Sequence, residues 1–283
     1  MFFKRLIEDR LQTGISSLSR LSGGDINEVY SLKTQGAHYI LKCNTATHFP
    51  LMFDKEAKGL QLLGKGGVKV PEVIDQFEAE GHQFLLLEYL EESRANSGFW
   101  NAFGMELSRL HRNSSSQFGL EYDNYIGSLV QRNDVRDSWS DFFIEMRLEP
   151  LVKMGFDNAL LDKGHLDKFA RLYGVFPDLV PDEQPALIHG DLWSGNLLCS
   201  TLQRPVFIDP AVYFGHREMD LAMTFMFGGF DRNYLESYQE HFPLEGGWEK
   251  RIAIHNLYPN LVHLNLFGST YLGNILSVLK AFI

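Results

Sequence analysis

Short apolar runs alternate with longer amphipathic stretches along this chain. Runs at residues 39–42, 83–90, 186–188 and 205–208 predict short buried strands. Between the first two runs, Phe53, Leu60 and Leu63 recur at helical spacing. The pattern up to residue 90 therefore indicates strands around one central helix.

After residue 90 the pattern becomes mainly helical. Phe99, Phe103, Leu107 and Leu110 share one face of a predicted helix, and residues 137–152 and 160–173 repeat that kind of pattern. We expect Pro150 to kink or end the first of these two helices. Strands interrupt at about 186–213, and helices then resume. The predicted fold class is α+β with two lobes. We expect residues 1–90 to form a small, mainly β lobe and residues 91–283 to form a larger, mainly helical lobe.

Polar residues at fixed spacing follow the strands of the second lobe. The segment His189-Gly-Asp-Leu-Trp-Ser-Gly-Asn196 is followed by Phe207-Ile-Asp-Pro210, so Asn196 lies five residues and Asp209 eighteen residues after Asp191. Phosphoryl transfer of the kinase type uses one Asp to orient a hydroxyl, and an Asn and a second Asp to bind magnesium. A turn-rich hairpin with loop-capping Asp and Asn is the alternative. The complete spacing favours the catalytic interpretation.

Candidate nucleotide-binding residues precede this segment. Lys42 ends an apolar strand and resembles a kinase phosphate-binding lysine, and Glu56 lies on the following helix, where it could pair with Lys42. Taken alone, Lys42 would more often be an ordinary lysine at a strand end, and Glu56 would more often be a solvated helix glutamate. Gly23 and Gly24 could bring backbone N–H groups close to phosphate. Gly-Gly-Asp is also an ordinary hairpin turn and lacks the usual glycine spacing. The backbone of Glu88 and Leu90 is placed to bind adenine, unless this run is simply a core strand.

Together these segments resemble the fructosamine kinase (ketoamine kinase) family, a branch of the aminoglycoside-phosphotransferase-like, protein-kinase-like superfamily. The resemblance covers nearly the whole chain, and the segments that carry it are 23–27, 53–60, 124–128, 139–143, 189–196 and 215–224. The Trp-Ser-Gly within residues 189–196 and the segments at 124–128 and 139–143 are closer to the ketoamine kinase branch than to the wider superfamily.

The resemblance implies a site and a reaction. ATP and Mg²⁺ would bind between the lobes, with Asn196 and Asp209 as metal ligands and Asp191 as catalytic base. Asp220 would support the catalytic loop by accepting its backbone N–H groups, although a charge at a helix N-terminus is the simpler explanation. Trp193 would stack on the sugar. The substrate would be a ketoamine, formed when a sugar glycates an amine, and it would be phosphorylated on its third carbon. Elimination of the product would then release the amine, which is a deglycation activity.

Composition narrows the class of protein further. The chain has 283 residues, 45% hydrophobic and 22% charged, with a net charge of −10. That charge argues against nucleic acid and suits a cationic small substrate, although a solvated acidic surface is the commoner cause. No apolar run reaches membrane-spanning length, and residues 1–10 are too charged for a secretion signal and predict an amphipathic helix. We expect a cytoplasmic monomer or weak homodimer, with Cys43 and Cys199 as core residues.

Two histidines near the C-terminus raise the question of a metal. His255 and His263 lie eight residues apart, but we expect no carboxylate or cysteine beside them and interpret both as packing residues.

Two other functions remain open. One is a kinase for another small hydroxylated amine, such as an aminoglycoside or choline, against which the Trp-Ser-Gly and 124–128 segments argue. The other is a pseudokinase that binds nucleotide without catalysis. The presence of Lys42, Asp191, Asn196 and Asp209 argues against it.

Overall fold

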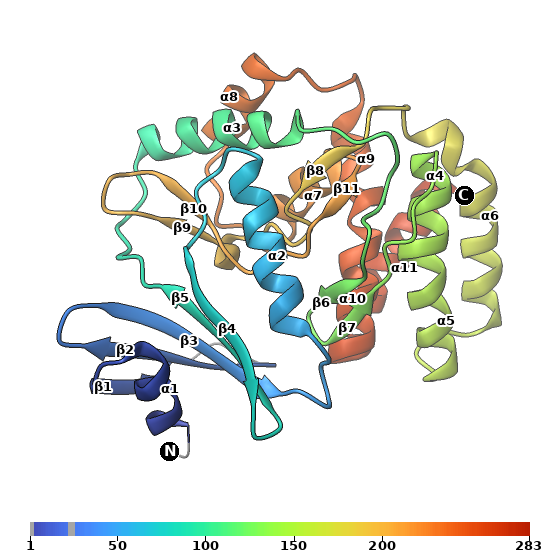
Figure 1. The fold of residues 1–283 in the computed structure, drawn as a ribbon. Helices are drawn as coiled ribbons and strands as arrows, with labels where there is room; N and C mark the ends of the chain where they lie inside the picture. The colour runs from blue at the N-terminus through green and yellow to red at the C-terminus, as the bar shows by residue number, and fades with distance from the viewer. Residues whose placement is uncertain (1–2, 22–25) are drawn as a thin grey trace.

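The small lobe is a five-stranded antiparallel sheet with one helix packed on each face. The structure, a computed structural model, describes residues 3–21 and 26–283. The sheet has the order β1-β2-β3-β5-β4 (Figure 1). Its elements are α1 (Lys4–Leu11), β1 (Ile15–Arg20), β2 (Glu28–Thr34), β3 (His38–Thr45), α2 (Met52–Lys65), β4 (Val73–Ala79) and β5 (His82–Glu88).

Alternation along β5 explains why a helix covers each face. Successive side chains of a strand point to opposite faces of the sheet. Phe84 and Leu86 pack in the cluster that contains Ile7 of α1, whereas Leu85 and Leu87 pack against α2. The amphipathic first helix and the central helix predicted from the sequence are therefore both present.

The larger lobe is mainly helical, which confirms the predicted α+β bilobal fold. Its helices are α3 (Ser97–His111), α4 (Trp139–Phe142), α5 (Glu149–Asp157), α6 (Lys163–Leu179), α7 (Glu218–Met226), α8 (Asn233–His241), α9 (Trp248–His255), α10 (Leu257–Phe267) and α11 (Leu272–Phe282). Short antiparallel pairs lie among them: β6 (Asn124–Ile126) with β7 (Leu129–Gln131), β8 (Ala186–Ile188) with β11 (Tyr213–Gly215), and β9 (Leu197–Cys199) with β10 (Pro205–Phe207). The predicted division at residue 90 stays a prediction.

One expected helix end is absent. Pro150 was expected to kink or end its helix, but α5 contains it in its first turn and continues to Asp157. The turns immediately before α5, Phe143–Leu148, are a π-helix. The backbone stays helical from Trp139 to Asp157, so Pro150 lies inside one continuous helical segment, and the hydrogen-bond pattern changes to wider π-turns just before the residue that lacks an N–H. The chain therefore changes helical form before the proline instead of ending.

Helix α2 joins the two lobes. Figure 1 shows it between the sheet and the strands of the larger lobe. Phe53 and Leu60 pack on the sheet, whereas Leu63 belongs to the cluster of the larger lobe. A Cβ added at Gly59 would lie 3.4 Å from Pro210 and Val212 side-chain atoms, and one at Gly66 would lie 2.8 Å from Leu110. Close packing on both sides thus fixes the helix that carries Glu56.

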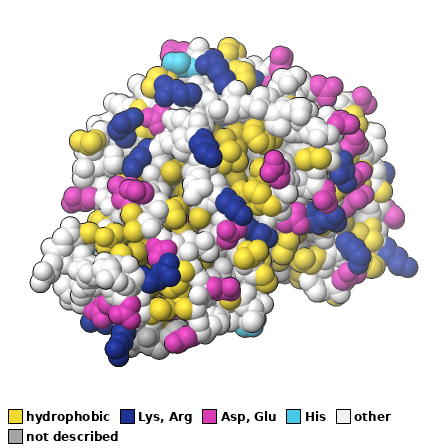
Figure 2. All heavy atoms as spheres, viewed as in Figure 1, with side chains coloured by type: hydrophobic (Ala, Val, Ile, Leu, Met, Phe, Trp, Pro, Cys, Tyr) yellow, Lys and Arg dark blue, Asp and Glu magenta, His cyan; other side chains and the backbone are white. Residues whose placement is uncertain are grey.

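The surface mixes charges of both signs. Figure 2 shows acidic and basic side chains interspersed over one face, with hydrophobic side chains between them. Among residues 3–21 and 26–283, no helix combines the length and apolar character needed to cross a bilayer. Cys43 and Cys199 are buried and unpaired with each other, as expected for core residues.

Candidate active site

Two antiparallel strand pairs bring the polar segments of the larger lobe together. Leu197 of β9 pairs with Phe207 of β10, so Asn196 and Asp209 leave the same end of that pair. Ile188 of β8 pairs with Tyr213 of β11, which places the residues after β8 beside those before β11. Segments 189–196 and 208–212 therefore lie side by side, although they are separate in sequence.

The start of the loop at residues 189–196, which we name the catalytic loop after its predicted role, is held by backbone contacts that require particular residues. Gly190 has φ +82°, and a Cβ there would lie 2.1 Å from the Ala211 carbonyl oxygen. The buried imidazole of His189 donates from Nε2 to the Ile208 carbonyl at 2.9 Å and accepts the Asp191 N–H at Nδ1. Burial lowers the pKa of His189, which is consistent with this neutral form. These bonds join the two segments directly beside Asp191.

Asp220, in the first turn of α7, is fully buried beneath this loop. Its carboxylate accepts the His189 N–H at 2.7 Å and the Gly190 N–H at 2.9 Å. His111 of α3 lies 3.1 Å away through Nε2, and its Nδ1 lies 2.8 Å from the Tyr238 hydroxyl. A buried carboxylate is stable only when hydrogen-bonded, and here three N–H donors surround it. His111 and Tyr238 were not predicted, because their distance in sequence conceals the contact.

Asp191 and Asn196 face each other across the loop. Asn196 Nδ2 donates to the Asp191 backbone carbonyl at 2.8 Å and to its carboxylate at 3.0 Å. Burial raises the pKa of Asp191 to about 7; the Asn196 hydrogen bond opposes the rise, and the charges of Asp209 and Asp220 add to it. A carboxyl group with a pKa near neutral is suited to accept a proton.

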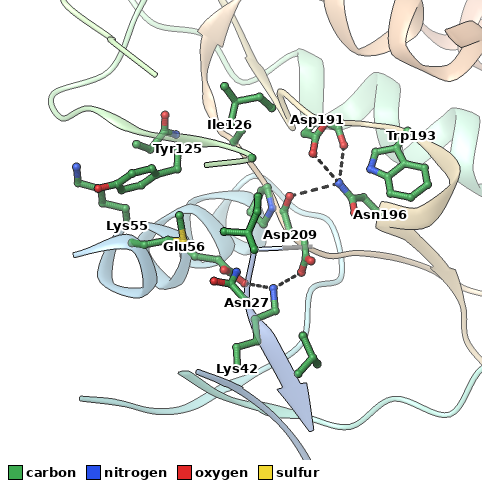
Figure 3. Close-up of a pocket in the computed structure, with 17 residues that line it drawn as sticks. Asn27, Lys42, Lys55, Glu56, Tyr125, Ile126, Asp191, Trp193, Asn196 and Asp209 are labelled. Carbon is green, nitrogen blue, oxygen red and sulfur yellow. Dashed lines mark hydrogen bonds and ion pairs between the residues drawn. The ribbon is translucent and has the colours of Figure 1, made fainter. Parts of the chain in front are cut away.

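Lys42 lies between two carboxylates contributed by different parts of the chain. Its Nζ is 2.7 Å from Glu56 Oε1 and 2.5 Å from Asp209 Oδ1 (Figure 3). Burial alone would lower the pKa of Lys42, but the two carboxylates outweigh it and raise the pKa above its usual value. Asp209 has φ +53°, a left-handed conformation that Asp tolerates better than most residues. Side chains from β3, from α2 and from the larger lobe thus meet around the Lys42 ammonium group.

These groups surround one cavity of about 260 Å³. The described residues that line it include six sequence candidates: Lys42, Glu56, Asp191, Trp193, Asn196 and Asp209. Glu88 and Leu90 lie outside this lining, and the Glu88 carboxylate instead accepts from Lys69 and from the backbone of Glu72. Gly23 and Gly24 lie outside the described residues, although the segment that contains them does connect β1 to β2. The adenine and phosphate-loop assignments stay predictions.

Trp193 borders the cavity and depends on a glycine for its position. Its side chain is 38% exposed, which is high for an aromatic residue. A Cβ on Gly195 would lie 2.2 Å from the Trp193 ring. Glycine at 195 therefore lets the indole lie against its own loop with one side open toward the cavity.

The β6–β7 hairpin, which contains the 124–128 segment, is hydrogen-bonded to the backbone that follows Asp209. Asn124 donates to the Val212 carbonyl at 2.9 Å, and Gln131 donates to the Ala211 carbonyl at 3.0 Å. The Tyr125 hydroxyl donates to the Pro50 carbonyl at 3.0 Å, so the β6–β7 hairpin also contacts the small lobe. The sequence of this segment indicated the family, but its hydrogen bonds to residues 211 and 212 are visible only in the structure.

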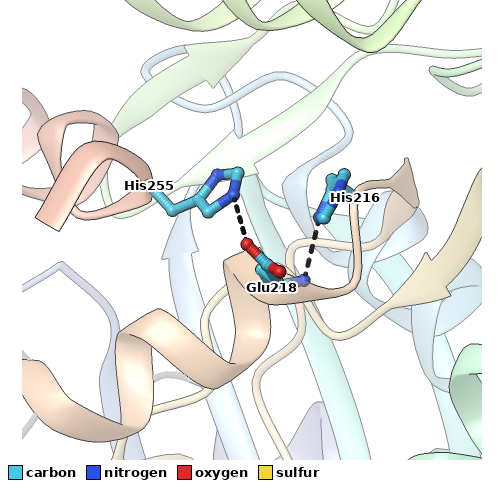
Figure 4. A group of neighbouring side chains, drawn as sticks. All are labelled: His216, Glu218 and His255. Carbon is cyan, nitrogen blue, oxygen red and sulfur yellow. Dashed lines mark hydrogen bonds and ion pairs between the residues drawn. The ribbon is translucent and has the colours of Figure 1, made fainter. Parts of the chain in front are cut away.

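The expectation that no carboxylate accompanies His255 was wrong. His255 Nε2 lies 3.2 Å from the buried carboxylate of Glu218, beside His216 (Figure 4). Both oxygens of Glu218 also accept from Arg251, at 2.6 and 2.8 Å. The cation that balances Glu218 is therefore an arginine, and we interpret the cluster as a buried ion-pair network.

The fold and this arrangement of side chains are those of a kinase-like phosphotransferase. An aminoglycoside phosphotransferase, APH(4)-Ia, solved as a ternary complex with ADP and hygromycin B, superposes with a TM-score of 0.67 over 99% of both chains. At 15% identity, that likeness concerns the fold alone. A solved structure from Thermobifida fusca, named "putative fructosamine-3-kinase", has a TM-score of 0.89 at 30% identity and covers 98% of this chain and 97% of its own.

The chain belongs to the fructosamine kinase family, whose model matches residues 2–283. A relative from Enterococcus faecium, named "probable ketoamine kinase", is 37% identical over 92% of this chain and 93% of its own length. A protein-ribulosamine 3-kinase from Oryza sativa is 33% identical over 96% of this chain and 80% of its own length.

Proposed function

We propose that this protein is an ATP-dependent kinase that phosphorylates the 3-hydroxyl of sugar-derived ketoamines of the fructosamine, ribulosamine or erythrulosamine type. The observation that carries the proposal is the meeting of Lys42, Glu56, Asp191, Asn196 and Asp209 around one cavity. A lysine held by a carboxylate, together with an Asp, an Asn and a second Asp, is the set that kinase-type phosphoryl transfer requires.

The residues present fit a magnesium ion. Mg²⁺ prefers oxygen ligands, commonly one or two carboxylates together with substrate phosphates. The Asp209 side chain is 44% exposed toward the cavity and keeps Oδ2 beyond its contact with Lys42. Asn196 uses its Nδ2 for Asp191, so its amide oxygen is the atom that would face a metal. A bound ion would neutralise charge on the ATP phosphates.

The protein's own groups perform the remaining steps. Lys42 neutralises phosphate charge and is held in place by Glu56. Asp191 accepts the proton of the substrate hydroxyl as that oxygen attacks the γ-phosphorus in line, which forms the new P–O bond while the bond to ADP breaks. Asn196 keeps the Asp191 carboxylate oriented. Most of the rate then comes from positioning and charge stabilisation.

The ketoamine assignment is supported by the family and by the names of its relatives. At 15% identity, the likeness to the aminoglycoside phosphotransferase APH(4)-Ia shows the fold and does not indicate the substrate of this chain. The relatives at 33% and 37% identity are named for ribulosamine and ketoamine substrates. Phosphorylation at the third carbon would make the adduct prone to β-elimination, which releases the amine and gives a deglycation activity.

A coupled assay of ADP formation tests the function. Ribulose-, erythrulose- and fructose-amines would be compared with an aminoglycoside and with choline, each with wild type and with Asp191→Asn. We expect turnover of at least one ketoamine and a loss of roughly a hundredfold or more in the variant, the usual contribution of general-base catalysis. Faster turnover of the aminoglycoside or choline than of every ketoamine would contradict the assignment. Wild-type turnover by Asp191→Asn would exclude that residue as the base.

A further inference from the structure

A second cavity, of about 520 Å³, adjoins the first at the catalytic loop. The two cavities share five lining residues, among them Asp191, Trp193 and Ile126. A substrate whose hydroxyl faces Asp191 can therefore extend into the second cavity. In a ketoamine, the part that extends beyond the sugar is the substituent on the amine nitrogen.

Five of the eleven described residues that line the second cavity carry aromatic rings, and we call these five the aromatic wall: Trp193, Phe227, His263, Phe267 and Tyr271. Phe227 follows α7, His263 and Phe267 belong to α10, and Tyr271 ends the short 3₁₀ helix after it. The Trp193 and Phe227 ring centroids are 6.0 Å apart in an edge-to-face arrangement. His263 lies 5.2 Å from Phe227, 5.4 Å from Phe267 and 4.9 Å from Tyr271. The rings thus form a connected series that begins at the catalytic loop.

Besides Trp193, two of these rings remain open to solvent. Phe227 is 44% exposed and Phe267 is 53% exposed. Their apolar surface is left in water, in a cavity that also contains Asp191. Exposed aromatic side chains in such a cavity are typical of a ligand-binding site.

The lining carries no fixed positive charge. The described residues around the second cavity include no lysine or arginine, and their one carboxylate is Asp191. His263 donates from Nδ1 to the Pro259 carbonyl at 2.7 Å, and burial lowers the pKa of its imidazole, so the ring is neutral near pH 7. An acidic substituent would thus find no cation in this lining and would face the Asp191 carboxyl group. An uncharged aryl or alkyl group would find aromatic contacts.

The aromatic wall is tied to the catalytic loop by a close backbone approach. Gly228 and Gly229 follow Phe227 with φ +73° and +90°, and a Cβ on Gly229 would lie 2.6 Å from the Ser194 Cβ. Phe227 also directly follows α7, whose first turn contains Asp220. Its ring is therefore positioned by the same elements that position the base.

We propose that this second cavity binds the substituent on the ketoamine nitrogen and selects uncharged aryl or alkyl amines over amines that carry a carboxylate next to the nitrogen. The proposal rests on the proposed function and names the amine component of its substrate.

The test compares one sugar on three amines. Adducts of the best-accepted sugar with benzylamine, methylamine and glycine would be assayed for kcat/KM with wild type, Phe267→Ala and Phe227→Ala. In wild type we expect the benzylamine adduct to exceed the methylamine adduct by about tenfold or more, as burial of a phenyl group predicts. The glycine adduct should fall below the methylamine adduct.

Each aromatic variant should lose most of the benzylamine preference, because kcat/KM should fall much more for the benzylamine adduct than for the methylamine adduct, while KM for ATP stays within about twofold. Phe156→Ala is the matched control, because Phe156 is 36% exposed on α5 and lies outside the lining. Equal kcat/KM for the three adducts in wild type, or an unchanged preference in both variants, would overturn this proposal alone. Absence of turnover with every ketoamine would overturn it together with the proposed function.

Discussion

Replacing Asp220 with asparagine would test whether this carboxylate holds the catalytic loop. Its Oδ2 accepts from His189 N–H and faces His111 Nε2, while Oδ1 accepts from Gly190 N–H. An asparagine can keep its oxygen at the first position, but its NH₂ group then faces the Gly190 N–H. One buried donor loses its acceptor, at a cost of about 1–3 kcal/mol, and the remaining bonds lose their charge assistance, at a cost of about 1–2 kcal/mol.

The sum, about 2–5 kcal/mol, should lower Tm by roughly 5–15 °C in a protein of this size. Turnover should also fall, because the Gly190 peptide precedes Asp191. Differential scanning calorimetry and steady-state kinetics on one preparation would measure both effects. Asp157→Asn is the control: its side chain is 55% exposed and pairs with Lys153, an interaction worth about 1 kcal/mol or less. A Tm for Asp220→Asn equal to that of the control would refute the reasoning.

Three further predictions concern other parts of the site and its support. Asp209→Ala should weaken MgATP binding by about tenfold or more, a loss typical even of outer-shell changes, and calorimetry with and without EDTA checks the metal dependence. Gly195→Ala should displace the Trp193 ring and lower kcat/KM for a ketoamine, while KM for ATP stays within a few-fold. Trp193→Ala should have the same effect on the two kinetic constants. A large fall in Tm with equal losses for both substrates would instead mark Trp193 as a packing residue. Burial lowers the pKa of His216 to about 4, whereas the pKa of an unfolded histidine is about 6.5. As the pH decreases, the unfolded state therefore binds the proton first, and the stability of the folded state falls between about pH 6.5 and pH 4. His216→Asn should flatten that part of a Tm-versus-pH curve, and an unchanged curve would contradict this assignment.

The fold was predictable because each lobe has its own periodicity. Runs such as 83–90 and 205–208 are short, apolar and bounded by polar residues, and the helical face from Phe99 to Leu110 is regular. The candidate site was predictable for a related reason: Asp191, Asn196 and Asp209 belong to one strand–loop unit, so their spacing in sequence determines their proximity.

The parts that sequence reasoning missed depend on contacts between distant segments. His111 contacts Asp220, which lies 109 residues later in the sequence, and no local sequence pattern predicts such a contact. The aromatic wall likewise joins Phe227 to α10 through packing alone. Glu218 was missed as the partner of His255 because the two residues lie on different helices, α7 and α9.

The close packing of α2 has a consequence for regulation. Protein kinases control activity in part by moving the helix whose glutamate pairs with the phosphate-binding lysine. Here Gly66, which directly follows α2, lets the end of that helix approach the larger lobe so closely that an added Cβ would lie 2.8 Å from Leu110, and an added Cβ at Gly59 would be in contact with Pro210. Outward movement of α2 would separate packed apolar surfaces at both positions as well as the Lys42–Glu56 pair. We therefore expect an enzyme without an on–off switch at this helix, whose flux follows the supply of ATP and glycated amine.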